Sequence, residues 1–188
     1  EFFKQIYPNQ EVKTEEEFRA QVKSDIENYW SGQAKNFLHN ELYERFIHET
    51  DFELPTDFLK RWLLVSEDKY QTMEEVEAAY DGFSHGIRWE LILKKLVEEN
   101  NIDVTKEEIE GAVKAQLQQY FGGQAFDESA DWVQQFMNKQ MQDRDTYEKT
   151  YRQVLNNKVF DFLENKIDKE DKKIAVEDFI KLPHKHQN

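Results

Sequence analysis

The chain has 188 residues, of which 34% are charged, and its formal charge is −14. This acidity excludes a nucleic-acid-binding face, which must neutralise phosphate, and excludes docking on an anionic membrane surface. Cysteine is absent, so disulfides, thiolate chemistry and cysteine-ligated metals are excluded as well. Hydrophobic residues make up 38% of the chain and aromatic residues 14%, too many for a disordered protein. Because the chain opens with Glu1 and not Met, we expect it to be part of a longer protein.

The first elements in chain order are a short helix and a very long one. Residues 1–10 are expected to form the short helix, which ends at Pro8. Thr14 and Glu17 then form a capping box, a reciprocal pairing that starts a helix. Apolar residues keep helical spacing from Phe18 to Phe46, which predicts one helix of about 35 residues, or roughly 50 Å. A helix of this length cannot be covered on all sides by so small a chain.

A corner follows at residues 51–64, where Pro55 ends one helix and begins the next. Four apolar residues after it share one face by their spacing: Phe58, Leu59, Trp62 and Leu63. We expect three of them, Phe58, Trp62 and Leu63, to lock the root of a helical arm. A second capping box, Thr72 with Glu75, opens a helix that reaches about Asn100. This helix carries two apolar stripes, so we interpret it as the central helix with more than one neighbour.

The second half of the chain predicts three more helices and a loose tail. Asn100 and Asn101 favour a left-handed helix end, and the next capping box joins Thr105 to Glu108. That helix is expected to run to about Phe121, where two glycines interrupt the pattern. An amphipathic segment over residues 126–141 and a long helix over 143–167 follow. Residues 172–176 suit a short extended segment, 177–182 a last helical turn, and 183–188 a loose end.

These patterns predict an all-α fold in which long helices form a body with protruding helical arms. We expect a single domain over residues 1–188, with arms around 55–121 and 122–167. Within it, five residues are predicted to lie in the core: Trp62, Tyr80, Ile87, Leu91 and Val159.

The motifs typical of enzymes are missing from the sequence. The glycines at 122 and 123 lack the lysine and hydroxyl residue of a phosphate loop. There is no Gly-x-Ser-x-Gly elbow and no zinc-protease pair of histidines. The acidic pairs at helix starts suit the helix dipole, and His184 with His186 lies in the tail. We therefore predict no catalytic residues, no metal site and no cofactor.

The aromatic and methionine residues around the glycine break are the best candidates for a binding surface. Met and aromatic side chains adapt to many partners, and an acidic surrounding would keep such a surface in solution. The alternative is that they fill ordinary seams between helices. The predicted surface comprises Phe37, Phe121, Phe126, Trp132, Phe136 and Met141.

The order of several short segments resembles the C-terminal domain of bacterial trigger factor. The matching segments begin with Phe2-Phe3, then Val12-Lys-Thr-Glu-Glu-Glu-Phe18, Glu53-Leu-Pro55 and Phe58-Leu-Lys-Arg-Trp-Leu63. They continue with Trp89-Glu-Leu-Ile92, Asn101-Ile-Asp-Val-Thr-Lys-Glu-Glu-Ile109 and Val176-Glu-Asp-Phe179. No single segment is diagnostic, but the ordered set spans almost the whole chain.

The resemblance implies the client-binding domain of a cytoplasmic, ribosome-associated chaperone that works without ATP. Its partners would be apolar segments of nascent or unfolded polypeptides, held in a cradle built by a body and two arms. In this family a separate N-terminal domain docks on the ribosome and a peptidyl-prolyl isomerase domain follows it. Neither has a counterpart in these 188 residues, so we expect this chain neither to dock on the ribosome nor to isomerise proline by itself.

Two alternatives remain open at this level. One is the helical core of a periplasmic parvulin-type chaperone, which upstream residues would distinguish. The other is a helical scaffold that binds a single defined protein partner with high affinity. The oligomeric state is also open, since apolar arms could form a homodimer by burying the faces that hold clients.

Overall fold

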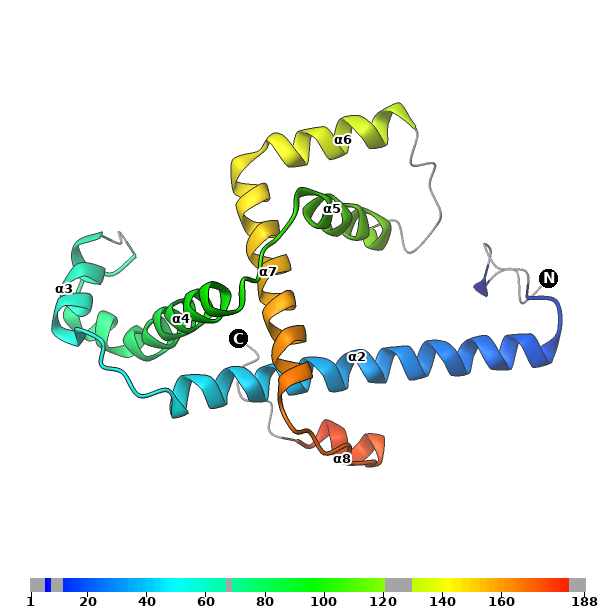
Figure 1. Cartoon of the computed structure of the whole chain (residues 1–188), viewed down its shortest axis with the longest axis horizontal. Helices are drawn as coiled ribbons and strands as arrows, with labels where there is room; N and C mark the ends of the chain where they lie inside the picture. The colour runs from blue at the N-terminus through cyan, green and yellow to red at the C-terminus, as the bar shows by residue number, and fades with distance from the viewer. Residues whose placement is uncertain (1–5, 8–11, 67–68, 121–129, 183–188) are drawn as a thin grey trace. The chain divides into compact units, whose positions relative to one another are not determined.

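The computed structural model describes residues 6–7, 12–66, 69–120 and 130–182, and all regular secondary structure in these ranges is helical (Figure 1). This confirms the all-α prediction. In chain order the longer helices are α2 (Glu15–Glu49), α3 (Thr56–Ser66), α4 (Met73–Asn100), α5 (Lys106–Tyr120), α6 (Asp131–Gln142) and α7 (Arg144–Lys166). The short helix α8 (Val176–Ile180) follows them. In the described ranges no helix is both long enough and apolar enough to cross a membrane.

Local capping decides where three of these helices begin. In each box the glutamate amide donates to the threonine hydroxyl, and the threonine amide donates to the glutamate carboxylate. The N···O distances lie between 2.8 and 3.3 Å in the pairs Thr14–Glu17, Thr72–Glu75 and Thr105–Glu108. All three predicted capping boxes are therefore confirmed. The first of them opens α2, which has 35 residues as predicted.

The ends and corners also follow local rules. Asn101 has a φ of 51°, the left-handed conformation that ends α4 as predicted. Pro55 immediately precedes α3, and its carbonyl oxygen accepts from the amide of Leu59 at 2.9 Å. Asp143 caps α7 by accepting from the amide of Thr146 at 2.9 Å. The predicted helix over 1–10, the glycine break and the tail beyond 182 lie outside the described residues, apart from Ile6 and Tyr7.

The chain divides into two compact units, each assembled from separate segments. The first unit comprises Glu1–Lys35 and Asn101–Glu170, and so contains the N-terminal part of α2 together with α5, α6 and α7. The second comprises Asn36–Asn100 and Asp171–Asn188, with the C-terminal part of α2, α3, α4 and α8. Helix α2 therefore contributes residues to both units.

In the first unit, α5, α6 and α7 pack against one another in pairs. Helix α5 supplies a buried stripe at every fourth residue, and α6 and α7 also contribute buried apolar residues: Ile109, Val113 and Leu117 from α5, Val133 from α6, and Val159 and Leu163 from α7. The predicted burial of Val159 is thus confirmed. A spacing of four residues places such side chains on one helix face, so one stripe can hold both neighbours.

In the second unit, α3 packs against α4, and the C-terminal part of α2 meets α4 through aromatic rings. The rings of Tyr43 and Trp89 lie 5.1 Å apart between centroids. The short α8 reaches α2 through an edge-on contact between Phe37 and Phe179 at 5.9 Å. The buried apolar residues of these helices are Leu42, Ile47, Leu63, Val76, Trp89, Ile92 and Leu93.

The predicted burial of two core residues is wrong. Trp62 is 43% exposed and Leu91 is 47% exposed. Helix α3 buries a narrow face centred on Leu63, and Trp62 lies one residue around the helix, where it stacks on Phe83 at 6.2 Å. On α4 Trp89, Ile92 and Leu93 are buried, and Leu91 lies between them on the exposed side of the helix. The stripe that ends at Leu91 is buried at its other end, where Val76 is fully covered. Tyr80 and Ile87 are half-buried.

Candidate functional site

A groove between α5 and α6 in the first unit has a mainly apolar lining that includes aromatic side chains. It has a volume of about 400 Å³. We call it the α5–α6 groove and define it by the residues that line it: Val113, Gln116, Leu117, Tyr120, Trp132, Phe136 and Gln140. Two predicted surface residues, Trp132 and Phe136, are therefore brought together here, beside partners from α5 that the sequence analysis did not select.

The way α6 is anchored explains why these rings stay accessible. Val133 is buried against the neighbouring helices, which turns the adjacent Trp132 toward the rim of the groove. Phe136 and Gln140 follow Trp132 at intervals of four residues and line the same wall. Trp132 remains 47% exposed and Tyr120, on the opposite wall, 86% exposed. A ligand that covers these rings would remove a large apolar area from water, because each aromatic side chain can bury about 150–250 Å².

The other predicted surface residues lie elsewhere. Met141 lines a separate hollow of about 390 Å³, where Lys106, Glu110 and Lys114 of α5 make the wall polar. Phe37 belongs to the second unit, where it is half-buried against Phe179. Phe121 and Phe126 lie outside the described residues. The structure thus groups two of the six predicted residues in one groove.

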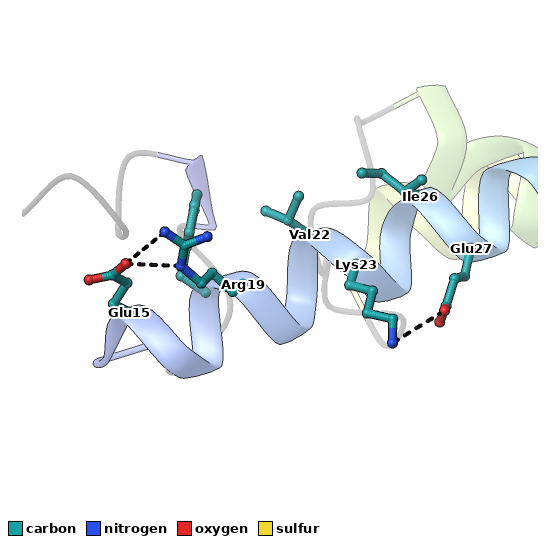
Figure 2. Close-up of a pocket in the computed structure, with 7 residues that line it drawn as sticks. Glu15, Arg19, Val22, Lys23, Ile26 and Glu27 are labelled. Atoms are coloured by element: carbon teal, nitrogen blue, oxygen red, sulfur yellow. Dashed lines mark hydrogen bonds and ion pairs between the residues drawn. The ribbon is translucent and has the colours of Figure 1, made fainter. Parts of the chain in front are cut away.

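A second apolar surface lies on the N-terminal part of α2, and the sequence analysis did not select it. Figure 2 shows Val22 and Ile26 pointing to the same side of the helix, along a hollow of about 720 Å³ that Phe18 also lines. We call Phe18, Val22 and Ile26 the α2 stripe. The sequence contains a pattern that could have pointed to the α2 stripe, because its apolar residues are four positions apart on a helix too long to be covered. The same spacing also predicts the helix itself, and for this reason it does not single out a binding surface.

Charged pairs border the α2 stripe along the helix (Figure 2). Glu15 pairs with Arg19 at 2.9 Å, and Lys23 pairs with Glu27 at 3.7 Å. Such exposed pairs four residues apart stabilise the helix only slightly. They leave the apolar side chains between them accessible while keeping the surface polar at its edges.

Three carboxylates of the first unit have a lowered pKa because they accept hydrogen bonds at helix starts. Hydrogen bonds from the backbone amides of Lys13 and Thr14 lower the pKa of Glu17, and hydrogen bonds from Lys158 and the Thr105 amide lower that of Glu108. Capping of Thr146 lowers the pKa of Asp143. These carboxylates are committed to helix starts, and none of the three lines the α5–α6 groove or the α2 stripe. What the two surfaces offer a ligand is apolar contact.

Fold and surfaces together define an all-helical protein that presents accessible apolar grooves. A family model described as "Probable trigger factor, C-terminal domain" matches residues 35–183, and the chain belongs to this family. Family membership supports a chaperone-type role. It also favours the trigger-factor interpretation over the parvulin-type alternative.

Two curated relatives have the same family name. The chain is 26% identical over 184 residues to a protein named "Trigger factor" from Salinibacter ruber (strain DSM 13855 / M31), which covers 84% of this chain and 35% of that protein. It is 24% identical over 184 residues to a "Trigger factor" from Gluconobacter oxydans (strain 621H), which covers 89% of this chain and 40% of that protein. The chain thus spans well under half the length of these relatives. No solved structure matches it.

Proposed function

We propose that this chain is the client-holding domain of a trigger-factor-type chaperone, which binds apolar segments of nascent or unfolded polypeptides without ATP. The observation that carries the proposal is the α5–α6 groove, in which Trp132 and Tyr120 remain accessible at the edge of a packed helical unit. If a folded protein did not bind a ligand in such a groove, burying the aromatic rings would increase its stability. Their accessibility is therefore an argument for an apolar ligand.

The dimensions of the two surfaces favour short apolar segments as ligands. The α5–α6 groove and the α2 stripe are separate hollows of about 400 and 720 Å³ in the first unit. Neither presents a set of convergent polar groups that would select one ligand. Each contact would be hydrophobic and weak, and several contacts along one client would raise the overall affinity.

The charge of the chain supports its solubility. A net charge of −14 keeps the protein in solution although its apolar grooves are accessible. Exposed charged pairs beside the α2 stripe serve the same purpose locally.

The test is whether the full chain delays aggregation of a chemically unfolded client, followed by light scattering. The informative variant is Tyr120→Ser with Trp132→Ser, which removes the two most exposed rings of the α5–α6 groove. Phe58→Ser is the matched control, because this ring is also exposed but belongs to α3 of the second unit. We expect the double variant to lose most of the delay and Phe58→Ser to keep it.

Binding must also be shown directly. In an NMR titration with an apolar peptide, we expect shifts at the α5–α6 groove that the double variant abolishes. No delay of aggregation together with no shifts would overturn the proposal. One saturable, high-affinity partner in pull-downs, without any effect on unfolded clients, would favour the helical scaffold instead.

The remaining properties of the family are proposed for the longer protein. Ribosome docking and proline isomerisation are assigned by resemblance to other domains of the family, and a cytoplasmic location goes with them. For these 188 residues we propose client holding alone. Isomerase activity of the isolated chain on a proline-containing peptide would contradict this division of labour.

A further inference from the structure

The length of the α5–α6 groove distinguishes a helical ligand from an extended one. Its α6 wall runs from Trp132 through Phe136 to Gln140, which is about 12 Å along the axis at about 1.5 Å per residue. The α5 wall, from Val113 to Tyr120, is about 10 Å long by the same rule. A length of about 12 Å corresponds to two turns of an α-helix, but to only three or four residues of extended chain.

The two forms of ligand present different numbers of side chains to a groove of this length. Two helical turns place the residues i, i+4 and i+7 on one face. An extended segment turns only every second residue to one side, so it presents about two side chains over the same distance. Because the free energy of apolar contact follows the area removed from water, a helix gains more from this groove.

The backbone of the ligand favours the same form. Both walls are α-helices, whose N–H and C=O groups are bonded within the helix except at its ends. Among the polar side chains of the lining, Gln116 already donates to Gln153 of α7 at 3.2 Å. An extended ligand would therefore lay backbone groups against apolar side chains without hydrogen-bond partners, whereas a helix satisfies its own backbone.

The charge of the lining specifies the face that a helix must present. Among the described residues, none that lines the groove is charged. A lysine or glutamate on the docked face would lose its hydration without gaining an opposite charge. The docked face must therefore be uncharged over two turns, while the opposite face stays in water and accepts polar residues. This is the pattern of an amphipathic helix.

We propose that the α5–α6 groove binds client segments as amphipathic helices, with the apolar residues i, i+4 and i+7 of the client between its two walls. The client packs as a third helix against α5 and α6, whose lining residues recur at the three- and four-residue spacings of its own face. This inference rests on the proposed function and specifies the form in which a client is held. A client segment that is already helical binds more tightly, because less ordering remains to be done on binding.

The test compares three peptides of about three helical turns and identical net charge, titrated into the isotope-labelled full chain and followed by NMR. The first peptide has leucines at i, i+4 and i+7 in a background of alanine and glutamine. The second has the same composition with leucines at alternate positions, and the third is the first with a central proline, which prevents the helix. We expect the first to bind at least about tenfold more tightly than the other two, with shifts at the indole N–H of Trp132.

The conformation of the bound peptide is a separate readout. Transferred nuclear Overhauser effects between successive amide protons should show that the first peptide is helical when bound. Tyr120→Ser with Trp132→Ser should abolish both these effects and the shifts, because it removes the exposed rings of both walls.

Gln140→Glu tests the uncharged face directly. It places a negative charge in the groove and should weaken binding of the first peptide at least about tenfold. Gln135→Glu is the matched control, because it adds the same charge to α6 at a residue that lines a different hollow. Its affinity for the peptide should equal that of the wild type, and thermal melts of both variants check that they are folded.

Equal affinity for the helical and proline peptides, extended-chain effects in the bound peptide, or unchanged affinity in Gln140→Glu would overturn the helical form and leave the proposed function intact. The absence of shifts in the groove with any of the peptides would overturn the helical form as well. The proposed function falls only if the chain also fails to delay the aggregation of unfolded clients.

Discussion

Lys158 shows how one side chain connects two helices of the first unit. From α7, its ammonium donates to the Glu108 carboxylate at 2.7 and 2.9 Å and to the carbonyl oxygen of Asp103. Glu108 also receives the amide of Thr105 in the capping box. The same carboxylate therefore starts α5 and holds α7 against it, and both sets of hydrogen bonds lower its pKa.

Glu108→Gln should make the free energy of unfolding less dependent on pH. A carboxyl whose folded-state pKa lies below its ordinary value of 4.5 stabilises the fold above that value, and the contribution is lost as the pH falls through the folded-state pKa. We expect the variant to be less stable than the wild type at about pH 7 and equally stable at about pH 2. Urea unfolding at both pH values measures the difference.

Glu110→Gln is the matched control, because Glu110 lies on the same helix and makes an exposed pair with Lys106 at 3.3 Å. Its stability should follow the wild type at both pH values. An equal loss in both variants at neutral pH would mean that the Lys158 bridge adds nothing.

Trp62 illustrates how the exposed fraction of a side chain changes the loss of stability expected when the side chain is truncated. Truncating a fully buried tryptophan costs about 3–5 kcal/mol. Because Trp62 is 43% exposed and stacks on Phe83, we expect Trp62→Ala to cost only about 1–2 kcal/mol. Trp62→Phe, which keeps a ring against Phe83, should recover much of this. Urea unfolding tests both, and a loss above about 3 kcal/mol would mean that the ring is buried in solution.

At the scale of elements, helix starts are the most local feature of this fold. Thr72→Ala removes the hydroxyl that accepts the Glu75 amide at 3.3 Å, and should destabilise the second unit by about 1 kcal/mol. Thr72→Ser keeps the acceptor oxygen and should remain near the wild type. Equal losses in both variants, measured by thermal unfolding, would show that the methyl group of the threonine matters more than its cap.

Helix α2 differs from the other elements because it serves both units. Its first part carries the α2 stripe and its last part contributes Leu42, Tyr43 and Ile47 to packing. A capping box and a run of compatible residues are enough to form such a helix, whereas its neighbours decide which stretch of it is buried. This is why its length was predictable and its accessible stripe was not.

At the scale of the whole molecule, the two units should respond separately to core damage. Ile109→Ala empties the core of the first unit and Leu63→Ala that of the second, each at a fully buried position. Each truncation should cost about 2–5 kcal/mol within its own unit. Hydrogen exchange should report it as lost protection of α5 and α7 in the first variant, and of α3 and α4 in the second. Equal loss across all four helices in either variant would show one cooperative unit.

The candidate surface was predictable only in part. Aromatic composition and helical spacing pointed to Trp132 and Phe136, because both properties are visible in one stretch of sequence. Their partners Tyr120, Val113 and Leu117 come from another helix, and pairing between helices depends on side-chain fit that no local pattern contains. Met141 follows Phe136 by only five residues, yet it lines a different hollow because it lies on another face of α6.

The sequence by itself determined the all-α fold, the three capped helix starts, the left-handed end at Asn101 and the resemblance that family membership confirmed. Each of these depends on residues close together in the chain, whose hydrogen bonds and spacing act without help from the rest of the molecule. Only the tertiary structure decided which residues of the two α4 stripes are buried, that α5 and α6 enclose a groove, and that Tyr43 meets Trp89. Those outcomes depend on which helix faces which, and that choice is made by packing between distant segments.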